Sequence, residues 1–519
     1  MRKIKSVAIF LVVFIFAALG MQTPATFAAE NKFNLFNGNI ESPAWNLAAT
    51  LKSTKNGGTI DNSIFKDSGY FYVEYTGEED GIQLILQSWS GGEGWAIATP
   101  SEVGVTEDNV NYAKFNEDSI KAVYKSDLST LDAIHVWNVK GGFTLKSIDY
   151  IYDAGNSDIK EDNKSELKTV MPTEDNVRYL GRAYNYNDEL WLAGSATGAE
   201  FLFTGTEAEI TFAGDYFANG ENINNARVAV YVDDELIADK MITEEESTIK
   251  VFKSEEARTV KITIRKLSES INGTVGIKNI KINKDGQVKQ SEKKARTIEF
   301  IGDSITCGYG VEDEDCSHSF KTSTENVTKS YAYKTAKALD ADLSVVSYSG
   351  YGVVSGYSGA GVKNPDQIVP KYYDKVGYSH GAFASKVKPD SIIWDFNKIQ
   401  PDVVVINLGT NDTNYCNSDE NKADFVQGYV SFLKTVREKN PNAKIICTLG
   451  IMGDSLFDSV QKAVDDYKEE TEDLNVDAMK FDVQNYSDGY AADWHPTEKT
   501  HDKAAAKLIE KIKEIMLWE

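Results

Sequence analysis

The chain has 519 residues, a formal net charge of −24 at pH 7 and an isoelectric point near 4.8. It is too long for one hydrophobic core, and at roughly 150 residues per domain we expect about three domains. The acidic balance excludes nucleic acid and anionic membrane surfaces as partners, since their phosphates would be repelled. A neutral, sugar-like partner fits this charge better.

The first 29 residues predict an export signal. Basic residues within positions 2–5 precede an apolar run over residues 7–19, and small residues lead to a cleavage point at Ala28 or Ala29. The run is too short for a membrane-spanning helix, and no other stretch is long enough. We therefore expect a secreted, extracellular protein without a membrane anchor.

Residues 31–153 predict an antiparallel β-sandwich. Short apolar runs alternate with Gly, Asn and Asp, and no helical period is present. The clearest strands are expected at 70–75, 82–86, 133–137 and 143–148. In style of sequence this region resembles a carbohydrate-binding module.

Tryptophans in this first sandwich have two interpretations. An aromatic side chain either packs in the core or forms an exposed platform that stacks on sugar rings. Trp89 and Trp95 flank a polar, glycine-rich loop that has nothing to bury it, which favours a sugar-contacting role for these two more than for Trp45 and Trp137.

A second β-sandwich, resembling a jelly roll, is predicted at residues 171–290. The polar segment 154–170 reads as a linker, and a charged bridge over 284–296 leads out of the domain. Asp233-Asp234 predicts a hairpin turn. Strands are expected at 200–203, 209–212, 227–232, 235–237 and 259–264.

Residues 296–519 change to alternating strands and helices. This pattern predicts an α/β domain of three layers, with helices on both faces of a parallel sheet. Strands are expected at 298–301, 343–347, 403–408, 444–449 and 479–483, and helices at 421–439, 457–471 and 497–516.

A candidate nucleophile follows the first strand of this domain. Gly302-Asp303 breaks the strand and places Ser304 at its carboxyl end, where open α/β sheets bind their ligands. A serine at neutral pH needs a base to take its proton, a group to orient that base, and donors for the developing oxyanion. The tripeptide also occurs in ordinary turns, so its partners decide.

Each of these roles has a candidate downstream. His495, just before the last helix, is the expected base, and Asp493 is placed to orient it if the chain is extended there, although a backbone carbonyl can do the same. The expected oxyanion donors are the backbone N–H groups of Ser304 and Gly350 and the amide of Asn411.

The four cysteines, at positions 307, 316, 416 and 447, show no spacing typical of a metal site. We expect no metal and no cofactor. Cys447 lies in an apolar run and is expected to be a buried thiol, whereas Cys316 and Cys416 lie in polar loops where a disulfide is possible in an exported protein.

The blocks around Ser304, Gly350, Asn411 and His495 together resemble the GDSL-type or SGNH hydrolase superfamily. The preceding jelly roll, the run WDFNKIQPDVVVINLGTND and the run DWHPTEKTH resemble carbohydrate esterase family 2 more closely. The resemblance implies a serine esterase that removes O-acetyl groups from plant polysaccharides such as xylan and glucomannan. It assigns Ser304 as nucleophile and His495 as general base.

One position departs from the wider superfamily, which places its aspartate three residues before the histidine, where Ala492 stands here. Asp493 is thus the less secure member of the set. Trp494, Tyr351 and Trp394 are candidates for sugar contact or for shaping the acetyl pocket. Alternatives are an esterase acting on O-acetylated peptidoglycan or a lipid, and a non-catalytic carbohydrate-binding surface protein.

Overall fold

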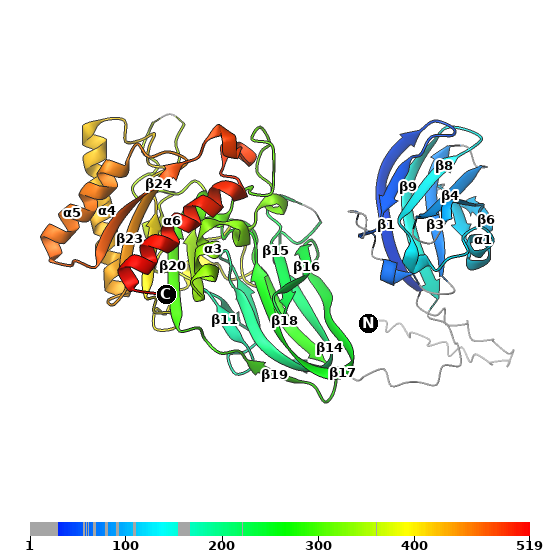
Figure 1. Cartoon of the computed structure of the whole chain (residues 1–519), viewed down its shortest axis with the longest axis horizontal. Coiled ribbons are helices and arrows are strands. Elements are labelled where there is room, and N and C mark those ends of the chain that lie inside the picture. The colour runs from blue at the N-terminus through cyan, green and yellow to red at the C-terminus, as the bar shows by residue number, and fades with distance from the viewer. Residues whose placement is uncertain are drawn as a thin grey trace, which may run out of the picture. The chain divides into compact units, whose positions relative to one another are not determined.

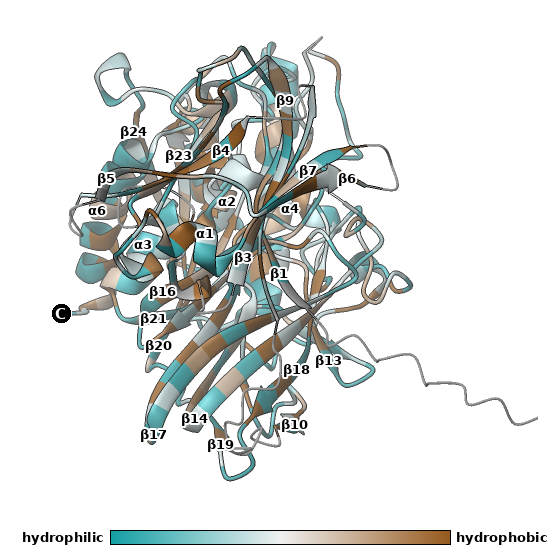
Figure 2. Ribbon diagram, turned by 90° about the vertical axis from the view of Figure 1, so that its right-hand side faces the viewer, coloured by the Kyte–Doolittle hydropathy of each residue, from teal (hydrophilic) through white to brown (hydrophobic). Residues whose placement is uncertain are grey.

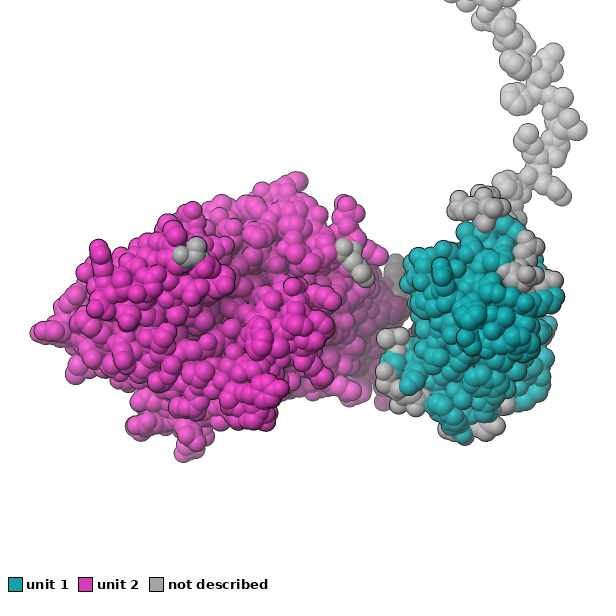
Figure 3. Space-filling view, turned by 90° about the horizontal axis from the view of Figure 1, so that it is seen from above, with its two compact units in different colours: residues 1–162 teal, residues 163–519 magenta. Residues whose placement is uncertain are grey.

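The computed structural model describes two stretches of the chain. These are residues 30–153, with gaps at 55–57, 59, 61, 66–68, 78–80, 90–92 and 107–109, and residues 167–519 except 221 and 360. The predicted export signal and most of the predicted linker lie outside them. The chain divides into two compact units, residues 1–162 and 163–519 (Figure 3). None of the helices described is both long and apolar enough to cross a membrane.

The first unit is a sandwich of two antiparallel sheets. Its elements are β1 (Glu30–Ser42), β2 (Ala49–Lys52), β3 (Gly69–Gly77), β4 (Ile82–Ser88), β5 (Glu93–Ala98), β6 (Glu102–Val105), β7 (Asn111–Phe115), α1 (Glu117–Lys121), β8 (Ala133–Asn138) and β9 (Phe143–Asp153). The sheet orders are β1-β9-β3-β7-β6 and β2-β8-β4-β5. Phe71 from one sheet and Leu84 and Val136 from the other are fully buried in a shared core. The predicted first sandwich is confirmed.

The second unit begins with an antiparallel β lobe. Its strands are β10 (Lys168–Val170), β11 (Arg178–Leu180), β12 (Tyr184–Tyr186), β13 (Glu189–Leu192), β14 (Gly198–Gly214), β15 (Arg227–Val232), β16 (Glu235–Met241), β17 (Glu246–Lys266), β18 (Val275–Ile282) and β19 (Gln287–Gln290). The main sheet runs β12-β13-β18-β14-β17-β15-β16. Figure 2 shows apolar and polar residues alternating along β14 and β17, as expected for strands with one buried face.

Three details of this lobe differ from the sequence prediction. The strands expected at 200–203 and 209–212 are one strand, β14, because the residues between them form bulges against β17 rather than a turn. Strand β10 lies in the predicted linker and pairs with β18, and β19 lies in the predicted bridge and pairs with β14. The hairpin turn at Asp233 and Asp234 is confirmed, with positive φ at both residues.

The remainder of the second unit is a three-layer α/β lobe. Its elements are β20 (Arg296–Gly302), α2 (Ser304–Cys307), α3 (Tyr331–Ala338), β21 (Ala341–Ser347), β22 (Val403–Asn407), α4 (Asp419–Lys439), β23 (Lys444–Ile451), α5 (Phe457–Thr471), β24 (Val476–Val483) and α6 (Glu498–Met516). The parallel sheet has the order β21-β20-β22-β23-β24. Helices α4 and α5 cover one face, and α3 and α6 cover the other (Figure 1). The predicted architecture is confirmed, and α3 is a helix that the sequence analysis missed.

A buried ion pair joins the two lobes of the second unit. Arg182, in the loop after β11, donates to the Glu299 carboxylate on β20 at 3.2 Å, and both side chains are almost fully buried. The Glu299 carboxylate also accepts hydrogen bonds from Ser344 and Tyr373. Strand β20, which leads to Ser304, is therefore anchored to the β lobe.

Candidate active site

The turn that carries Ser304 is tightly constrained. After β20 ends at Gly302, the Asp303 carboxylate caps α2 by accepting the N–H of Ile305 at 3.0 Å. A Cβ at position 302 would lie 2.1 Å from Thr306 Oγ1, so glycine is required for the helix to start so close to the strand. The serine is thus held at the carboxyl end of a central strand.

His495 meets this serine directly. Its Nε2 lies 2.8 Å from Ser304 Oγ, and its Nδ1 lies 3.2 Å from the carbonyl oxygens of Ala492 and Asp493. With the proton on Nδ1 donated to these carbonyls, Nε2 is free to accept the serine proton. The Tyr309 ring stacks on the imidazole with the ring centroids 4.0 Å apart, which fixes its orientation.

The prediction that the Asp493 carboxylate orients His495 is wrong. That carboxylate instead accepts hydrogen bonds from the Tyr309 hydroxyl at 2.8 Å and the Phe320 N–H at 2.9 Å. Asp493 and Trp494 have φ values of 49° and 63°, so the chain is not extended here and residues 493 and 495 do not face the same side. Two backbone carbonyls orient the histidine in its place.

Asn411 joins the turns that follow neighbouring strands. Its Nδ2 donates to the Tyr351 carbonyl at 2.9 Å, in the turn after β21, and to the Asp303 carboxylate at 3.3 Å, beside the serine. Gly350 has φ 81° in the first of these turns, and nothing would lie within 4 Å of a Cβ placed on it. The space beside the Gly350 backbone is therefore open.

Burial changes the titration of the site. It lowers the pKa of His495 to about 4, although the two carbonyls that face Nδ1 oppose the shift. It also raises the pKa of Asp303 to about 7 and that of Asp412 to about 6, against the stabilising effect of backbone N–H donors. The imidazole is consequently a neutral base over the whole neutral and mildly acidic range.

A cavity of about 460 Å³ is lined by Tyr309, whose ring stacks on His495, and by Ser349, the residue before Gly350. Its lining combines aromatic rings with a few polar groups, a composition typical of ligand pockets. Tyr351, predicted to contact substrate, is part of this lining. The others include Tyr309, Phe320, Tyr372, Tyr378 and His380.

The sequence analysis did not identify Tyr309, Phe320, Tyr372, Tyr378 or His380 as residues of this cavity. Only Tyr309 has a position in the sequence that could have indicated it. Tyr309 stands five positions after the serine, on the same local turn. Nothing in the sequence connects residues 269–272, which come from the β lobe, to the cavity that they help to line.

The two other residues predicted to contact substrate, Trp494 and Trp394, are not among the residues that line this cavity. The Trp494 side chain is 59% exposed, and its ring packs near that of Tyr490. Trp394 is 5% exposed and lines a different cavity of about 620 Å³, together with residues that begin β20 and β21. Thr297 and Asp342, which also line this cavity, lie at the amino ends of β20 and β21, whereas Ser304 follows the carboxyl end of β20. Trp394 is therefore at the opposite end of the sheet from the serine, and the prediction that it contacts substrate is wrong.

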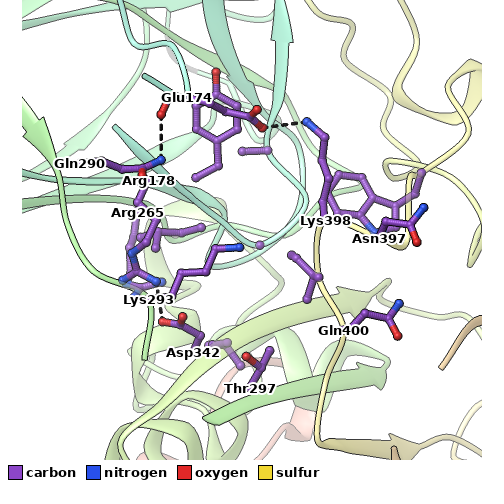
Figure 4. Close-up of a pocket in the computed structure, with 17 residues that line it drawn as sticks. Glu174, Arg178, Arg265, Gln290, Lys293, Thr297, Asp342, Asn397, Lys398 and Gln400 are labelled. Carbon is purple, nitrogen blue, oxygen red and sulfur yellow. Dashed lines mark hydrogen bonds and ion pairs between the residues drawn. The ribbon is translucent and has the colours of Figure 1, made fainter. Parts of the chain in front are cut away.

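Ion pairs bridge the polar lining of this second cavity (Figure 4). Arg178 pairs with Asp342 at 2.6 Å, and Lys398 pairs with Glu174 at 2.8 Å. Both pairs link the β lobe to the α/β lobe. These groups therefore stabilise the joint between the lobes.

Tryptophans of the first unit form an aromatic face on the sheet β2-β8-β4-β5. Trp95 is exposed and lies edge-on to Trp137 at 6.3 Å between ring centroids, and Trp137 meets exposed Trp45 in the same way at 5.8 Å. Trp89 is also exposed, at the end of β4. The structure thus adds Trp45 and Trp137 to the two residues singled out from the sequence.

The possible disulfide between Cys316 and Cys416 is not formed. All four cysteines belong to the described residues and are free thiols. Cys416 is buried in the core beneath α4 and its Sγ points toward the Asn421 carbonyl, 3.7 Å away. Cys316 lies in the loop that follows Glu312 and is only partly buried, so it is not paired with Cys416.

Three protein families match this chain. Residues 36–148 match carbohydrate binding module 65 domain 1, residues 179–306 match the carbohydrate esterase 2 N-terminal family, and residues 300–503 match the GDSL-like lipase/acylhydrolase family. These boundaries follow the first unit, the β lobe and the α/β lobe.

Individual proteins match as well. The cellulase/esterase CelE of Acetivibrio thermocellus is 33% identical over 67% of this chain, which spans 40% of CelE. The acetylxylan esterase/glucomannan deacetylase of Cellvibrio japonicus is 24% identical, over 68% of this chain and 93% of that protein. The structure of a family two carbohydrate esterase from Clostridium thermocellum in complex with cellohexaose is 31% identical, with a TM-score of 0.58, over 66% of this chain and all of that one.

The depressed pKa of His495 predicts the acid limb of the pH profile. Protonation of His495 removes the base, so the limb of kcat/KM for p-nitrophenyl acetate that belongs to His495 should have its midpoint near pH 4, below the titrations of Asp303 and Asp412. Tyr309→Ala exposes the imidazole to water and should move this midpoint upward. A wild-type midpoint near the ordinary histidine value of about 6.5 would contradict the desolvation argument.

The position of Asp493 predicts a small catalytic effect. Asp493→Asn keeps an acceptor for Tyr309 and should lower kcat less than about tenfold, whereas replacing a true triad aspartate costs about four orders of magnitude. Steady-state kinetics with Asp488→Asn as control, a nearby carboxylate that pairs with Lys503, checks this. A loss above a thousandfold confined to Asp493→Asn would show that its carboxylate orients the base.

Proposed function

Because the chain belongs to carbohydrate esterase family 2 of the carboxylic ester hydrolases, we propose that it removes O-acetyl groups from plant cell-wall polysaccharides, xylan and glucomannan, through a serine acyl-enzyme. The observation that carries this proposal is the 2.8 Å contact between Ser304 Oγ and His495 Nε2. The ring of Tyr309, which stacks on His495, also lines a cavity. A serine hydroxyl paired with a neutral imidazole is an activated nucleophile.

In the first half-reaction Ser304 Oγ attacks the acetyl carbonyl carbon, and its proton passes to His495 Nε2. The tetrahedral intermediate then collapses as the imidazolium gives that proton to the sugar oxygen, which leaves as an alcohol. The carbonyl oxygens of Ala492 and Asp493 stabilise the imidazolium through Nδ1–H. The acetyl group remains on Ser304.

Water completes the cycle. His495 Nε2 takes a proton from a water molecule whose oxygen attacks the acetyl carbonyl carbon. The second tetrahedral intermediate releases acetate, and Ser304 Oγ regains the proton from the imidazolium. The free enzyme returns with the same protonation as before.

The oxyanion donors are the N–H groups of Ser304 and Gly350 and the Nδ2 of Asn411. Asn411 Nδ2 donates one hydrogen bond to the Tyr351 carbonyl at 2.9 Å and a longer one to the Asp303 carboxylate at 3.3 Å. The hydrogen of the longer, weaker bond is the one that can turn to the oxyanion. Each such donor contributes on the order of a hundredfold in rate. Their arrangement at the ends of three adjacent strands suits a tetrahedral centre on Ser304.

The cavity supports a sugar ester as the substrate. Tyrosine and phenylalanine rings offer faces for sugar rings, and the rings of Tyr351, Tyr372 and Tyr378 cluster with centroids 4.6–6.0 Å apart. The relatives named for acetylxylan and glucomannan favour plant polysaccharides over peptidoglycan or lipid esters. Such polymers are extracellular, which agrees with the export signal predicted at residues 1–29.

The aromatic face of the first unit supports carbohydrate binding as a second function. Trp45, Trp95 and Trp137 adjoin one another on a single sheet, and the matching family is a carbohydrate-binding module. Indole rings in a row present a hydrophobic strip that complements the apolar faces of sugar rings. We propose that this unit holds the enzyme on its polymer.

Acetate release tests the esterase directly. Wild type should release acetate from acetylated glucomannan, acetylated xylan and p-nitrophenyl acetate, and Ser304→Ala should lower kcat by several orders of magnitude because no acyl-enzyme forms. Ser431→Ala, an exposed serine on α4, is the control and should behave as wild type.

The ratio of rates on the two polymers assigns the preferred polysaccharide. Hydrolysis of p-nitrophenyl acetate alone would move the proposal to another O-acyl ester. No release from any of the three would leave a non-catalytic carbohydrate-binding protein.

Removing one ring should weaken the aromatic face. Trp95→Ala in the full chain should reduce affinity for soluble xylan or glucomannan about tenfold in affinity electrophoresis, roughly 1.4 kcal/mol. The catalytic rate on p-nitrophenyl acetate should not change. Tyr112→Ala is a matched control, since Tyr112 stacks on Tyr72 in the other sheet of the sandwich. Equal losses for both variants would contradict the assignment of the binding face.

A further inference from the structure

A segment of the β lobe enters the catalytic lobe directly after β17. The Leu267 carbonyl accepts the N–H of Val327 at 3.1 Å, and the Ile271 carbonyl accepts the N–H of His380 at 2.7 Å. Residues 267–271 are thus held on both sides by the α/β lobe. Glu269 lies between these two fixed points.

The Glu269 carboxylate contacts two turns of the candidate active site. Its Oε2 accepts the N–H of Ser349 at 2.8 Å and lies 3.7 Å from the Cys307 thiol. Ser349 immediately precedes Gly350, and Cys307 ends the short helix that begins with Ser304. One buried side chain therefore touches both the turn that offers the Gly350 N–H and the helix that carries the nucleophile.

Other buried groups fix this carboxylate in place. Lys266 is fully buried, donates to the carbonyls of Ser268 and Glu269 at 3.0 and 2.6 Å, and attracts the carboxylates of Glu269 and Glu325. Glu325 Oε2 accepts the N–H of Glu269 at 2.8 Å. Burial raises the pKa of Glu269, raises that of Glu325 well above its ordinary value, and lowers that of Lys266 to about 8.

The turn that Glu269 contacts spans residues 348–351 and is closed by one backbone hydrogen bond, from the Tyr351 N–H to the Tyr348 carbonyl at 3.2 Å. Gly350 adopts φ 81° at the third position of this turn, where glycine is favoured. The Gly350 carbonyl accepts the Tyr357 N–H at 2.8 Å, and the Asp412 carboxylate accepts the N–H groups of Val353, Val354 and Ser355. Glu269 supplies the corresponding contact on the amino side of Gly350.

We propose that Glu269 is a positioning residue of the oxyanion hole, an inference that rests on the esterase function proposed above. By accepting the Ser349 N–H, its carboxylate fixes the peptides on the amino side of Gly350, so that the Gly350 N–H faces the oxyanion of the tetrahedral intermediate. The bond is 2.8 Å long, and a carboxyl oxygen can accept it whether the group is ionised or protonated. The β lobe in this way completes a site whose reacting groups all lie in the α/β lobe.

Kinetics on p-nitrophenyl acetate tests the role. Glu269→Ala should lower kcat about a hundredfold, as for the loss of one oxyanion donor, and change KM less than about threefold, because the donor acts mainly in the transition state. Glu269→Gln retains an oxygen that can accept the Ser349 N–H and should recover at least tenfold of that loss. A purely structural role would lower the melting temperature of Glu269→Ala and leave the kcat of the folded protein close to the wild-type value.

Glu200 provides the matched control. It is another buried carboxylate of the β lobe, paired with Arg178 at 2.6 Å and bonded to Ser291, with no contact to either active-site turn. Glu200→Ala should lower the melting temperature as much as Glu269→Ala and leave kcat within about threefold of wild type.

Three results would overturn the inference while the esterase proposal stands. These are an unchanged kcat in folded Glu269→Ala, equal kcat losses in Glu269→Ala and Glu200→Ala, and no recovery in Glu269→Gln. If Glu269→Ala does not fold, Glu269→Met replaces it as the variant that fills the space without an acceptor, and an unchanged kcat in Glu269→Met would be against the inference. A wild-type protein that hydrolyses no ester would overturn both proposals.

Discussion

The parallel pairing of β20 with β21 on one side and β22 on the other is the constraint on which the candidate site depends. In this register Gly302 lies beside Ser347 and Asn407, so the three strands end at the same level. Ser304, Gly350 and Asn411 each follow within a few residues of those ends. Residues only a few positions after a strand stay close to the end of that strand, so the three groups lie near one another. His495 approaches them from the loop before α6.

Buried carboxylates then hold the turns that the strands leave open. Asp303 caps the nucleophile helix, Asp412 gathers three successive N–H groups, and Glu269 accepts the N–H of Ser349. Removing a carboxylate from water is costly, and here backbone N–H donors offset part of that cost, although the pKa of each group remains raised. The result is a set of rigid turns in a region of low dielectric, where partial charges act strongly on developing charge.

Ion pairs also decide how the β lobe meets the α/β lobe. Arg178, Arg182 and Arg227 of the β lobe pair with Asp342, Glu299 and Glu312 of the α/β lobe. Arginine pairs of this kind are directional, so they specify one geometry where apolar contact alone would permit several. That geometry places Glu269, Ile271 and Asn272 of the β lobe in the lining of the cavity next to Tyr309.

The sequence by itself determined the layer architecture and the pairing of Ser304 with His495. Hydrophobic periodicity and the ends of strands can be read from short stretches of sequence. The carboxyl ends of parallel strands all lie at one edge of the sheet, so the polar residues that follow each strand must meet there. Tertiary structure alone decided the direction of the Asp493 carboxylate, the distance of Trp394 from the serine, the free thiols of Cys316 and Cys416 and the approach of Glu269. Each depends on the sign of a backbone angle or on contacts between segments far apart in the chain, which no local pattern encodes.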